Sequence, residues 1–161
     1  KDWLFAVTII MVFVVDQVSK YVVSQTLNLY ESWPSEGLVR ITYGTNSGTV
    51  WGLFPNATFL LTILSFFAIG LLYYFYRSHA LRNKLLRLAI GCQLGGALGN
   101  LSDRIRLGAV IDFIDVGWWP VFNLADSSIV VGIVILMIVV WFGGDRQHHS
   151  STAVETTDIS G

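Results

Sequence analysis

The sequence predicts an all-α membrane protein with four transmembrane helices and a small extracytoplasmic β-hairpin or β-cradle. The 161 residues are 53% hydrophobic and only 13% charged, whereas soluble domains carry about 25% charged residues. The apolar residues form long runs, and one crossing of a bilayer takes roughly 20 of them, so the chain has room for about four crossings. These observations exclude a multidomain soluble enzyme and a disordered chain.

The composition also argues against a disulfide, a zinc site and a nucleic-acid-binding surface. Cys92 is the sole cysteine, which excludes an internal disulfide. Three histidines are too few and too scattered for a zinc site, so we expect no metal and no cofactor. The net charge of −1 leaves no basic surface for nucleic acid.

The apolar runs predict a single membrane-embedded domain over residues 1–143, followed by a polar tail over 144–161. The first run resembles the core of a signal peptide, but Asp16 to Lys20 (DQVSK) follows without a small-residue cleavage site, so we expect a retained helix. The expected spans cover about residues 3–23, 57–76, 85–107 and 127–142.

An outer β region is expected over about residues 36–54. The segments LVRITY (Leu38 to Tyr43) and TVWGLF (Thr49 to Phe54) have strand character, and GTNSG (Gly44 to Gly48) between them predicts the turn of a hairpin. An open hairpin would leave backbone groups unpaired in hydrocarbon, so we place it at the interface. An aromatic belt at this level is expected from Trp33, Trp51, Trp118 and Trp119.

Basic residues predict the orientation. The loop between the second and third spans carries Arg77, Arg82, Lys84 and Arg87 and no acid. Short basic loops stay in the cytoplasm, so both termini are expected there and the β region outside.

Ionisable residues in the spans are costly and mark candidate functional positions. Asp16 and Lys20 are four residues apart on one helix face, where they can pair. A structural ion pair and a direct role in catalysis are both open, and the structural pair is the simpler interpretation.

The third span combines small and polar residues. Gly91, Gly95 and Gly99 recur every four residues, which favours close helix packing. Beyond them lie three polar residues at the outer end of the helix, Asn100, Asp103 and Arg104. For Arg104, a functional role and an extension of the side chain toward lipid phosphates are equally open.

Carboxylates at the outer boundary suggest acid–base chemistry. Asp112 lies in an apolar stretch, and Asn123 and Asp126 fit an N-cap of the fourth span. No histidine falls in the outer half, which disfavours a serine hydrolase. Two aspartates sharing one proton can activate water, and we expect Asp126, at a helix N-terminus, to be the member more readily ionised.

Four motifs resemble bacterial lipoprotein signal peptidase, the signal peptidase II family. They are DQVSK (Asp16 to Lys20), TNSG (Thr45 to Gly48), GGALGNLSDRIRLGAVIDF (Gly95 to Phe113) and FNLADSSIVVG (Phe122 to Gly132). One stretch departs from the family pattern, since Thr49, Val50 and Trp51 follow TNSG. Trp51 is either an interfacial residue or a substrate contact.

The resemblance implies an aspartic endopeptidase of the bacterial inner membrane that removes the signal peptide before a diacylglyceryl-modified cysteine. It places the catalytic pair at Asp112 and Asp126. The family's other polar positions fall on Asp16, Lys20, Asn46, Asn100, Asp103, Arg104 and Asn123. Of these, Asn46, Asn100, Arg104 and Asn123 are expected to bind substrate or support the site, and Asp103 is expected to pair with Arg104 or Arg106. The implied partners are lipid-modified prolipoproteins, membrane lipids and globomycin-like inhibitors.

Two other classes of protein are alternatives. A proton-coupled transporter would need ionisable residues through the inner half of the spans, yet the second span has no charged residue. A non-enzymatic assembly factor would use the glycine stripe to bind partner helices and would tolerate Asp112→Asn and Asp126→Asn.

Overall fold

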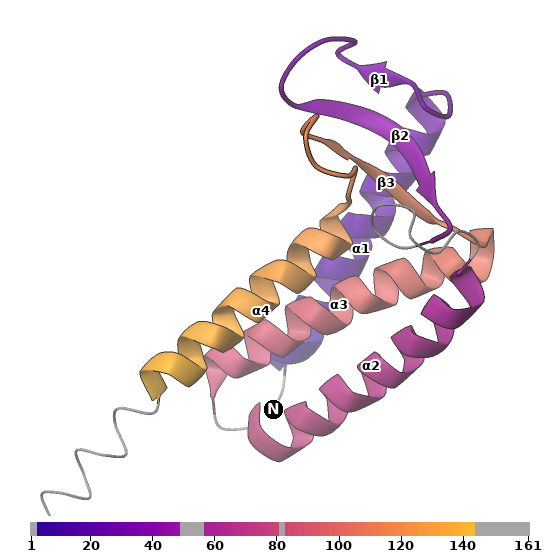
Figure 1. The fold of residues 1–161 in the computed structure, drawn as a ribbon. Coiled ribbons are helices and arrows are strands. Elements are labelled where there is room, and N and C mark those ends of the chain that lie inside the picture. The colour runs from indigo at the N-terminus through magenta and orange to yellow at the C-terminus, as the bar shows by residue number, and fades with distance from the viewer. Residues whose placement is uncertain (1–2, 49–56, 81–82, 144–161) are drawn as a thin grey trace, which may run out of the picture.

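The structure is a computed structural model, and it describes residues 3–48, 57–80 and 83–143. Four long helices form a bundle with a small sheet across one end (Figure 1). The helices are α1 (Trp3–Thr26), α2 (Thr58–His79), α3 (Lys84–Leu107) and α4 (Leu124–Gly143). They coincide with the four expected runs within a few residues.

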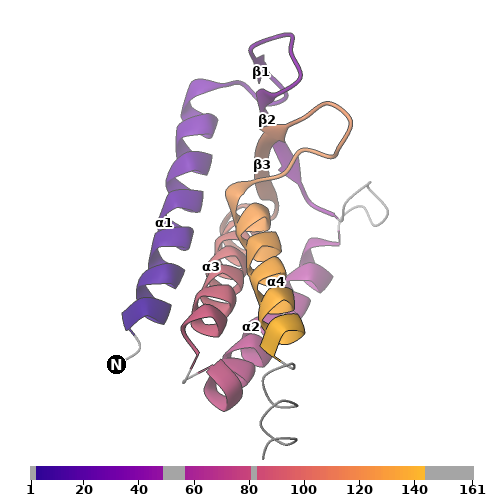
Figure 2. The same cartoon turned by 90° about the vertical axis from the view of Figure 1, so that its left-hand side faces the viewer.

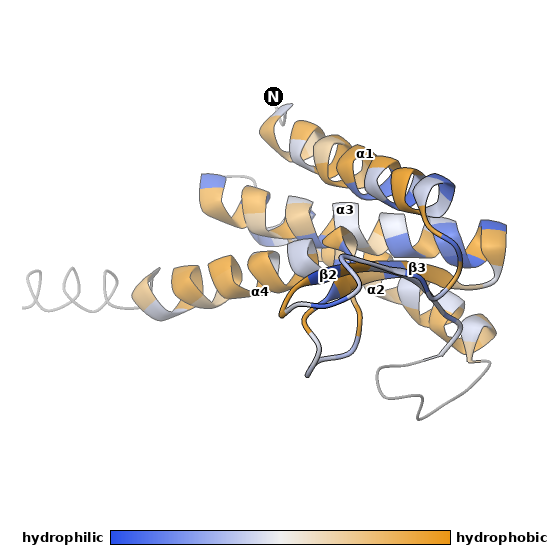
Figure 3. Ribbon diagram, turned by 90° about the horizontal axis from the view of Figure 1, so that it is seen from above, coloured by the Kyte–Doolittle hydropathy of each residue, from blue (hydrophilic) through white to orange (hydrophobic). Residues whose placement is uncertain are grey.

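The outer surface of the bundle is apolar, as lipid contact requires. α1, α2 and α4 are long and hydrophobic enough to cross a membrane. Side chains such as Phe67 and Met137 are 71% and 66% exposed, and Figure 3 shows blue residues interrupting the orange helices mainly near the sheet. The described chain is therefore mostly helical with three candidate membrane spans; α3 is not among these.

α3 is the central helix of the bundle, and α1, α2 and α4 each pack against it (Figure 2). Asn83 caps its start by accepting hydrogen bonds from the backbone N–H groups of Leu85 and Leu86. It ends at Gly108, whose φ of 73° suits a glycine C-cap. Its glycines permit the close packing, because a Cβ at Gly95 would lie 2.7 Å from Val12 of α1 and one at Gly96 would lie 2.4 Å from a carbonyl of α4.

The sheet differs in part from the expected hairpin. Its antiparallel strands are β1 (Ser32–Trp33), β2 (Arg40–Asn46) and β3 (Val110–Asp115), in the order β1-β2-β3. The strand expected from LVRITY is present as β2, but Gly44 to Asn46 continue it instead of forming the predicted turn. They do so because they pair with β3, a partner from far along the chain. The other expected strand, 49–54, lies outside the described residues, as does Trp51.

Two further elements differ from the ranges expected from the hydrophobic pattern. β3 was not expected, because its residues read as an apolar connection. α4 begins at Leu124, three residues before the predicted start at 127. The bonds that cap this helix, described below, account for the earlier start.

Candidate active site

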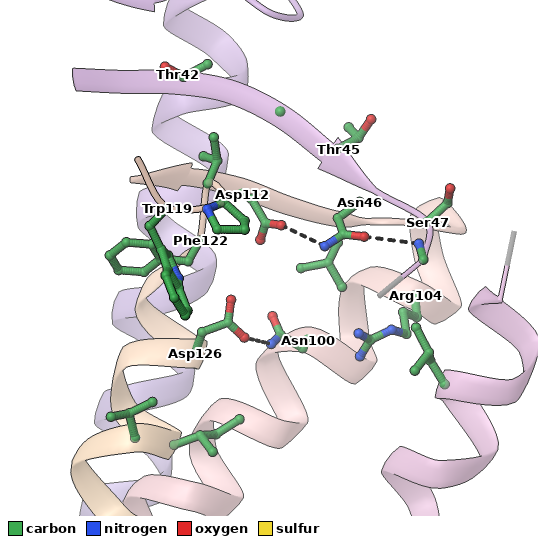
Figure 4. Close-up of a pocket in the computed structure, with 18 of the residues that line it drawn as sticks. Thr42, Thr45, Asn46, Ser47, Asn100, Arg104, Asp112, Trp119, Phe122 and Asp126 are labelled. Carbon is green, nitrogen blue, oxygen red and sulfur yellow. Dashed lines mark hydrogen bonds between the residues drawn. The ribbon is translucent and has the colours of Figure 1, made fainter. Parts of the chain in front are cut away.

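A cavity of about 820 Å³ lies where the sheet meets the ends of α2, α3 and α4 (Figure 4). Its polar lining includes Asn46 of β2, Asn100 and Arg104 of α3, Asp112 of β3 and Asp126 of α4. Its apolar lining includes Phe122, Ile129 and Val130, which lie in the motif FNLADSSIVVG. Leu61 and Val121 also line it; sequence analysis did not single these out, because no local signal distinguishes them from other apolar residues.

Asp112 and Asp126 face this cavity from different elements (Figure 4). Asp112 Oδ1 accepts a hydrogen bond from Asn123 Nδ2 at 2.6 Å, and its Oδ2 accepts one from Asn46 Nδ2 at 3.2 Å. Asp126 Oδ1 accepts one from Asn100 Nδ2 at 2.8 Å. Each carboxyl is therefore oriented by at least one asparagine amide.

Asn123 and Asp126 form a reciprocal cap at the start of α4. The Asp126 backbone N–H donates to Asn123 Oδ1 at 2.9 Å, and the Asn123 N–H donates to Asp126 Oδ2 at 3.4 Å. This is the geometry of a capping box, and the predicted N-cap is confirmed. The first turn of a helix thus fixes Asp126 in place.

The surroundings of Asp112 favour its protonated form. Burial, followed by the nearby charge of Asp126, raises the pKa of Asp112 to about 7, against the hydrogen bonds from Asn46 and Asn123 and the charge of Lys20. One member of the pair is therefore suited to carry a proton near neutral pH.

Arg104 directs its guanidinium into the cavity (Figure 4). Within the described residues no carboxylate lies within 4.0 Å of it, and its hydrogen bond to Ser65 Oγ is a long one of 3.5 Å. Arg104 is thus a cation in the cavity with donors available to a ligand.

Asp16, Lys20 and Asp103 form a buried ionic cluster behind the cavity. Lys20 Nζ lies 2.8 Å from Asp16 Oδ2 and 2.8 Å from Asp103 Oδ2. The expected Asp16–Lys20 pair is confirmed. The expectation that Asp103 pairs with Arg104 or Arg106 is wrong, because its carboxylate instead faces the lysine of α1.

The residues that the structure describes contain no cluster of three or more His, Cys, Asp or Glu side chains able to hold a metal ion. The polar groups of the cavity are amides, carboxyls and one guanidinium. This set suits acid–base hydrolysis by paired carboxyls.

Comparisons with known proteins agree with one another. The family model described as signal peptidase (SPase) II matches residues 8–142. A lipoprotein signal peptidase of Syntrophomonas wolfei is 42% identical over 88% of this chain and 95% of the relative. One of Halothermothrix orenii is 37% identical over 84% and 93%. A bacterial membrane enzyme solved by the in meso method at 2.3 Å superposes with a TM-score of 0.82 at 30% identity, covering 88% of this chain and 90% of that one.

Proposed function

Because this chain belongs to the signal peptidase II family, we propose that it removes lipoprotein signal peptides with Asp112 and Asp126 as its catalytic pair. The observation that carries this proposal is that both carboxyls line one cavity and that Asn123 donates to both, to Asp112 through its side-chain amide and to Asp126 through its backbone N–H. The relatives named above are lipoprotein signal peptidases, so the substrate is a prolipoprotein cut before its lipid-modified cysteine.

The proposed chemistry follows from the two environments. Asp126 acts as the base that takes a proton from the attacking water, and Asp112 as the acid that protonates the scissile carbonyl. The raised pKa of Asp112, caused mainly by burial, supports this division. When the C–N bond breaks, Asp126 gives its proton to the leaving amine and Asp112 takes one back from a hydroxyl group of the tetrahedral intermediate, so the pair again holds one proton.

The polar residues around the pair have distinct proposed roles. Asn46, Asn100 and Asn123 orient the carboxyls through the bonds described above. Arg104 donates to the backbone carbonyls of the bound peptide, which its open donors support. Asp16, Lys20 and Asp103 hold α1 and α3 together.

The signal helix of the substrate is proposed to enter between α2 and α4. Leu61 of α2 and Ile129 and Val130 of α4 line the cavity from two sides, and among the described elements α2 comes close to α3 but not to α4. An apolar helix can therefore reach the carboxyls from the bilayer while the lipid on its cysteine stays among membrane lipids.

We propose α3 as the fourth membrane span. Its 24 residues extend about 36 Å at 1.5 Å per residue, enough to cross the hydrocarbon. It lacks the apolar character of the other spans because neighbouring helices, instead of lipid, cover its glycines and polar groups. The proposed domain is 1–143, with 144–161 as a polar tail.

The basic residues support an orientation in the bacterial inner membrane. Arg77, Lys84 and Arg87 lie at the end of the bundle away from the sheet. By the positive-inside rule that end is cytoplasmic, which places both termini inside and the cavity at the outer face. Membrane lipids and globomycin-like inhibitors are the further proposed partners.

The test is cleavage of a lipidated precursor by the purified protein and by Asp112→Asn and Asp126→Asn. Each substitution keeps the side-chain shape but removes the acid–base group, so we expect turnover to fall about 10²- to 10⁴-fold. Melting temperatures establish that both variants are folded.

Asp115→Asn is the matched control. Asp115 is a buried acid of the same strand, but its carboxylate bonds to Arg40 and Thr42 and does not line the cavity. This variant should retain cleavage. Full cleavage by a folded Asp112→Asn or Asp126→Asn protein would refute the catalytic pair.

A further inference from the structure

Lys20 donates to three oxygens at once, although a single carboxylate would neutralise it. Its side chain is 2% exposed. Besides the carboxylates of Asp16 and Asp103, its Nζ donates to Asn100 Oδ1 at 3.0 Å. The third bond connects the ionic cluster to the cavity, because Asn100 lines the cavity.

This bond determines which way the amide of Asn100 faces. Its Oδ1 accepts from Lys20 and from Asn123 Nδ2, the latter at 3.1 Å. A reversed amide would place its NH₂ group against an ammonium, which has no acceptor. The NH₂ group therefore has to face Asp126, to which it donates at 2.8 Å.

The amide of Asn123 is fixed in the same manner from the other side. Its Oδ1 is held by the Asp126 backbone N–H, so its NH₂ group faces Asn100 and Asp112. The two asparagines thus form a continuous chain from Lys20 to both carboxyls. The orientation of every donor in this chain is set by Lys20 at one end and by the helix cap at the other.

Resting on the function proposed above, we propose that Lys20 is a positioning residue for the reaction: its ammonium fixes the asparagine donors that hold Asp112 and Asp126, and its charge sets the pH range in which the pair works. Lys20 touches neither carboxyl of the pair, so it acts through Asn100. This role is additional to holding helices together.

The charged groups around Lys20 determine whether its removal shifts the pH range of activity up or down. Acids face it from α1 (Asp16) and α3 (Asp103), and beyond the asparagines from β3 (Asp112) and α4 (Asp126); the nearby cations are Arg104 and Arg106 of α3. A neighbouring positive charge favours ionised carboxyls, and a neighbouring negative charge disfavours them. Removing Lys20 should therefore move the working range to higher pH, and removing Asp16 should move it to lower pH.

The experiment is the pH dependence of kcat/KM for a lipidated peptide, measured with the full chain. Lys20→Gln keeps a donor near Asn100 but removes the charge, and we expect the profile to move up by about one pH unit. Asp16→Asn should move it in the opposite direction. Lys20→Arg, which keeps the charge, should leave the profile in place with a lower kcat.

A purely structural role predicts a different outcome, namely lower melting temperatures and profiles that coincide with wild type. Coincident profiles for folded Lys20→Gln and Asp16→Asn would overturn the proposal. Should Lys20→Gln not fold, Lys20→Arg decides: an unmoved profile with a lower kcat supports the role, because the charge stays while the bond to Asn100 is displaced, and an unchanged kcat overturns it.

The test of the Lys20 role can be distinguished from the test of the proposed catalytic pair. Cleavage by Asp112→Asn or Asp126→Asn would remove the catalytic pair, and this inference with it. Inactive aspartate variants combined with an unmoved Lys20→Gln profile would overturn the role of Lys20 alone.

Discussion

At the scale of single residues, Asn123 links folding to chemistry. Its backbone and side chain cap α4 together with Asp126, and the same amide donates to Asp112. Asn123 itself is fully buried, so it is not exposed to solvent on its own side of these bonds. The residues that start the helix also set the distance and orientation between the two acids.

Asp112 should make stability depend on pH. Because its pKa is raised to about 7, mainly by burial, the folded state keeps a proton that the unfolded chain releases near pH 4. This stabilisation is complete below pH 4 and is lost as the pH rises to 7. Relative to wild type, Asp112→Asn should therefore gain about 1.4 kcal/mol of unfolding free energy per pH unit between about pH 4 and 7, and level off above.

Melting temperatures of both proteins in detergent from pH 4 to 8 check this. Asp115→Asn is again the control: burial raises the pKa of Asp115, but bonds from Gly117, Thr42 and Arg40 outweigh burial and lower it. Its difference from wild type should stay level across the same window. A level difference for Asp112→Asn as well would contradict the assignment of a protonated Asp112.

At the scale of elements, the glycines of α3 decide how closely its neighbours approach. A Cβ at Gly99 would lie 2.5 Å from Asp16 Oδ2, so this glycine makes room for the ionic cluster. The stripe expected to serve helix packing does so against α1, since Gly91 and Gly95 face Thr8 and Val12.

Gly99→Ala should destabilise the protein by about 1–3 kcal/mol, because the new methyl displaces a buried carboxylate. Gly70→Ala is the matched control, since Gly70 lies in α2 and a Cβ added there would have nothing within 4 Å. There alanine should be neutral or stabilising by about 0.5–1 kcal/mol. Thermal unfolding of the two variants measures the difference, and equal losses would argue against close packing at Gly99.

The helices and the cap were predictable from the sequence because their signals are local. Long apolar runs marked all four helices, and the spacing of Asn123 and Asp126 marked the cap. The pairing of β2 with β3 was not predictable, because Asn46 and Val110 are far apart in the chain and GTNSG is typical of a turn. The partner of Asp103 was missed for the same reason, since Lys20 lies on another helix.

Two kinds of sequence evidence indicated Asp112 and Asp126 as the candidate pair. Their residue type and depth at the outer boundary suggested them as a pair, and the resemblance to the family motifs then strengthened this choice over Asp16, Asp103 and Asp115. Fold geometry explains this distinction, because what separates the two groups is whether a carboxyl faces the cavity or a cation.

At the scale of the whole molecule, the bundle has a basic end and an end that carries the sheet and the cavity. Since Cys92 is the sole cysteine, orientation can be tested with single cysteines in a Cys92→Ala background. Ser35, near the sheet, and Ser78, at the other end, are both exposed.

An impermeant maleimide should label Ser35→Cys in intact spheroplasts and Ser78→Cys only after permeabilisation. The expected difference follows from the basic residues beside Ser78. Cleavage activity of both variants is the control for correct insertion. Labelling of Ser78→Cys alone in intact cells would reverse the proposed topology.

The separation of α2 from α4 has a consequence for pharmacology. A compound that takes the proposed route between α2 and α4 to the carboxyls first dissolves in the bilayer, so its effective dose is a mole fraction in lipid and not a concentration in water. Inhibition constants measured at different detergent or lipid loads should therefore agree only after correction for partitioning.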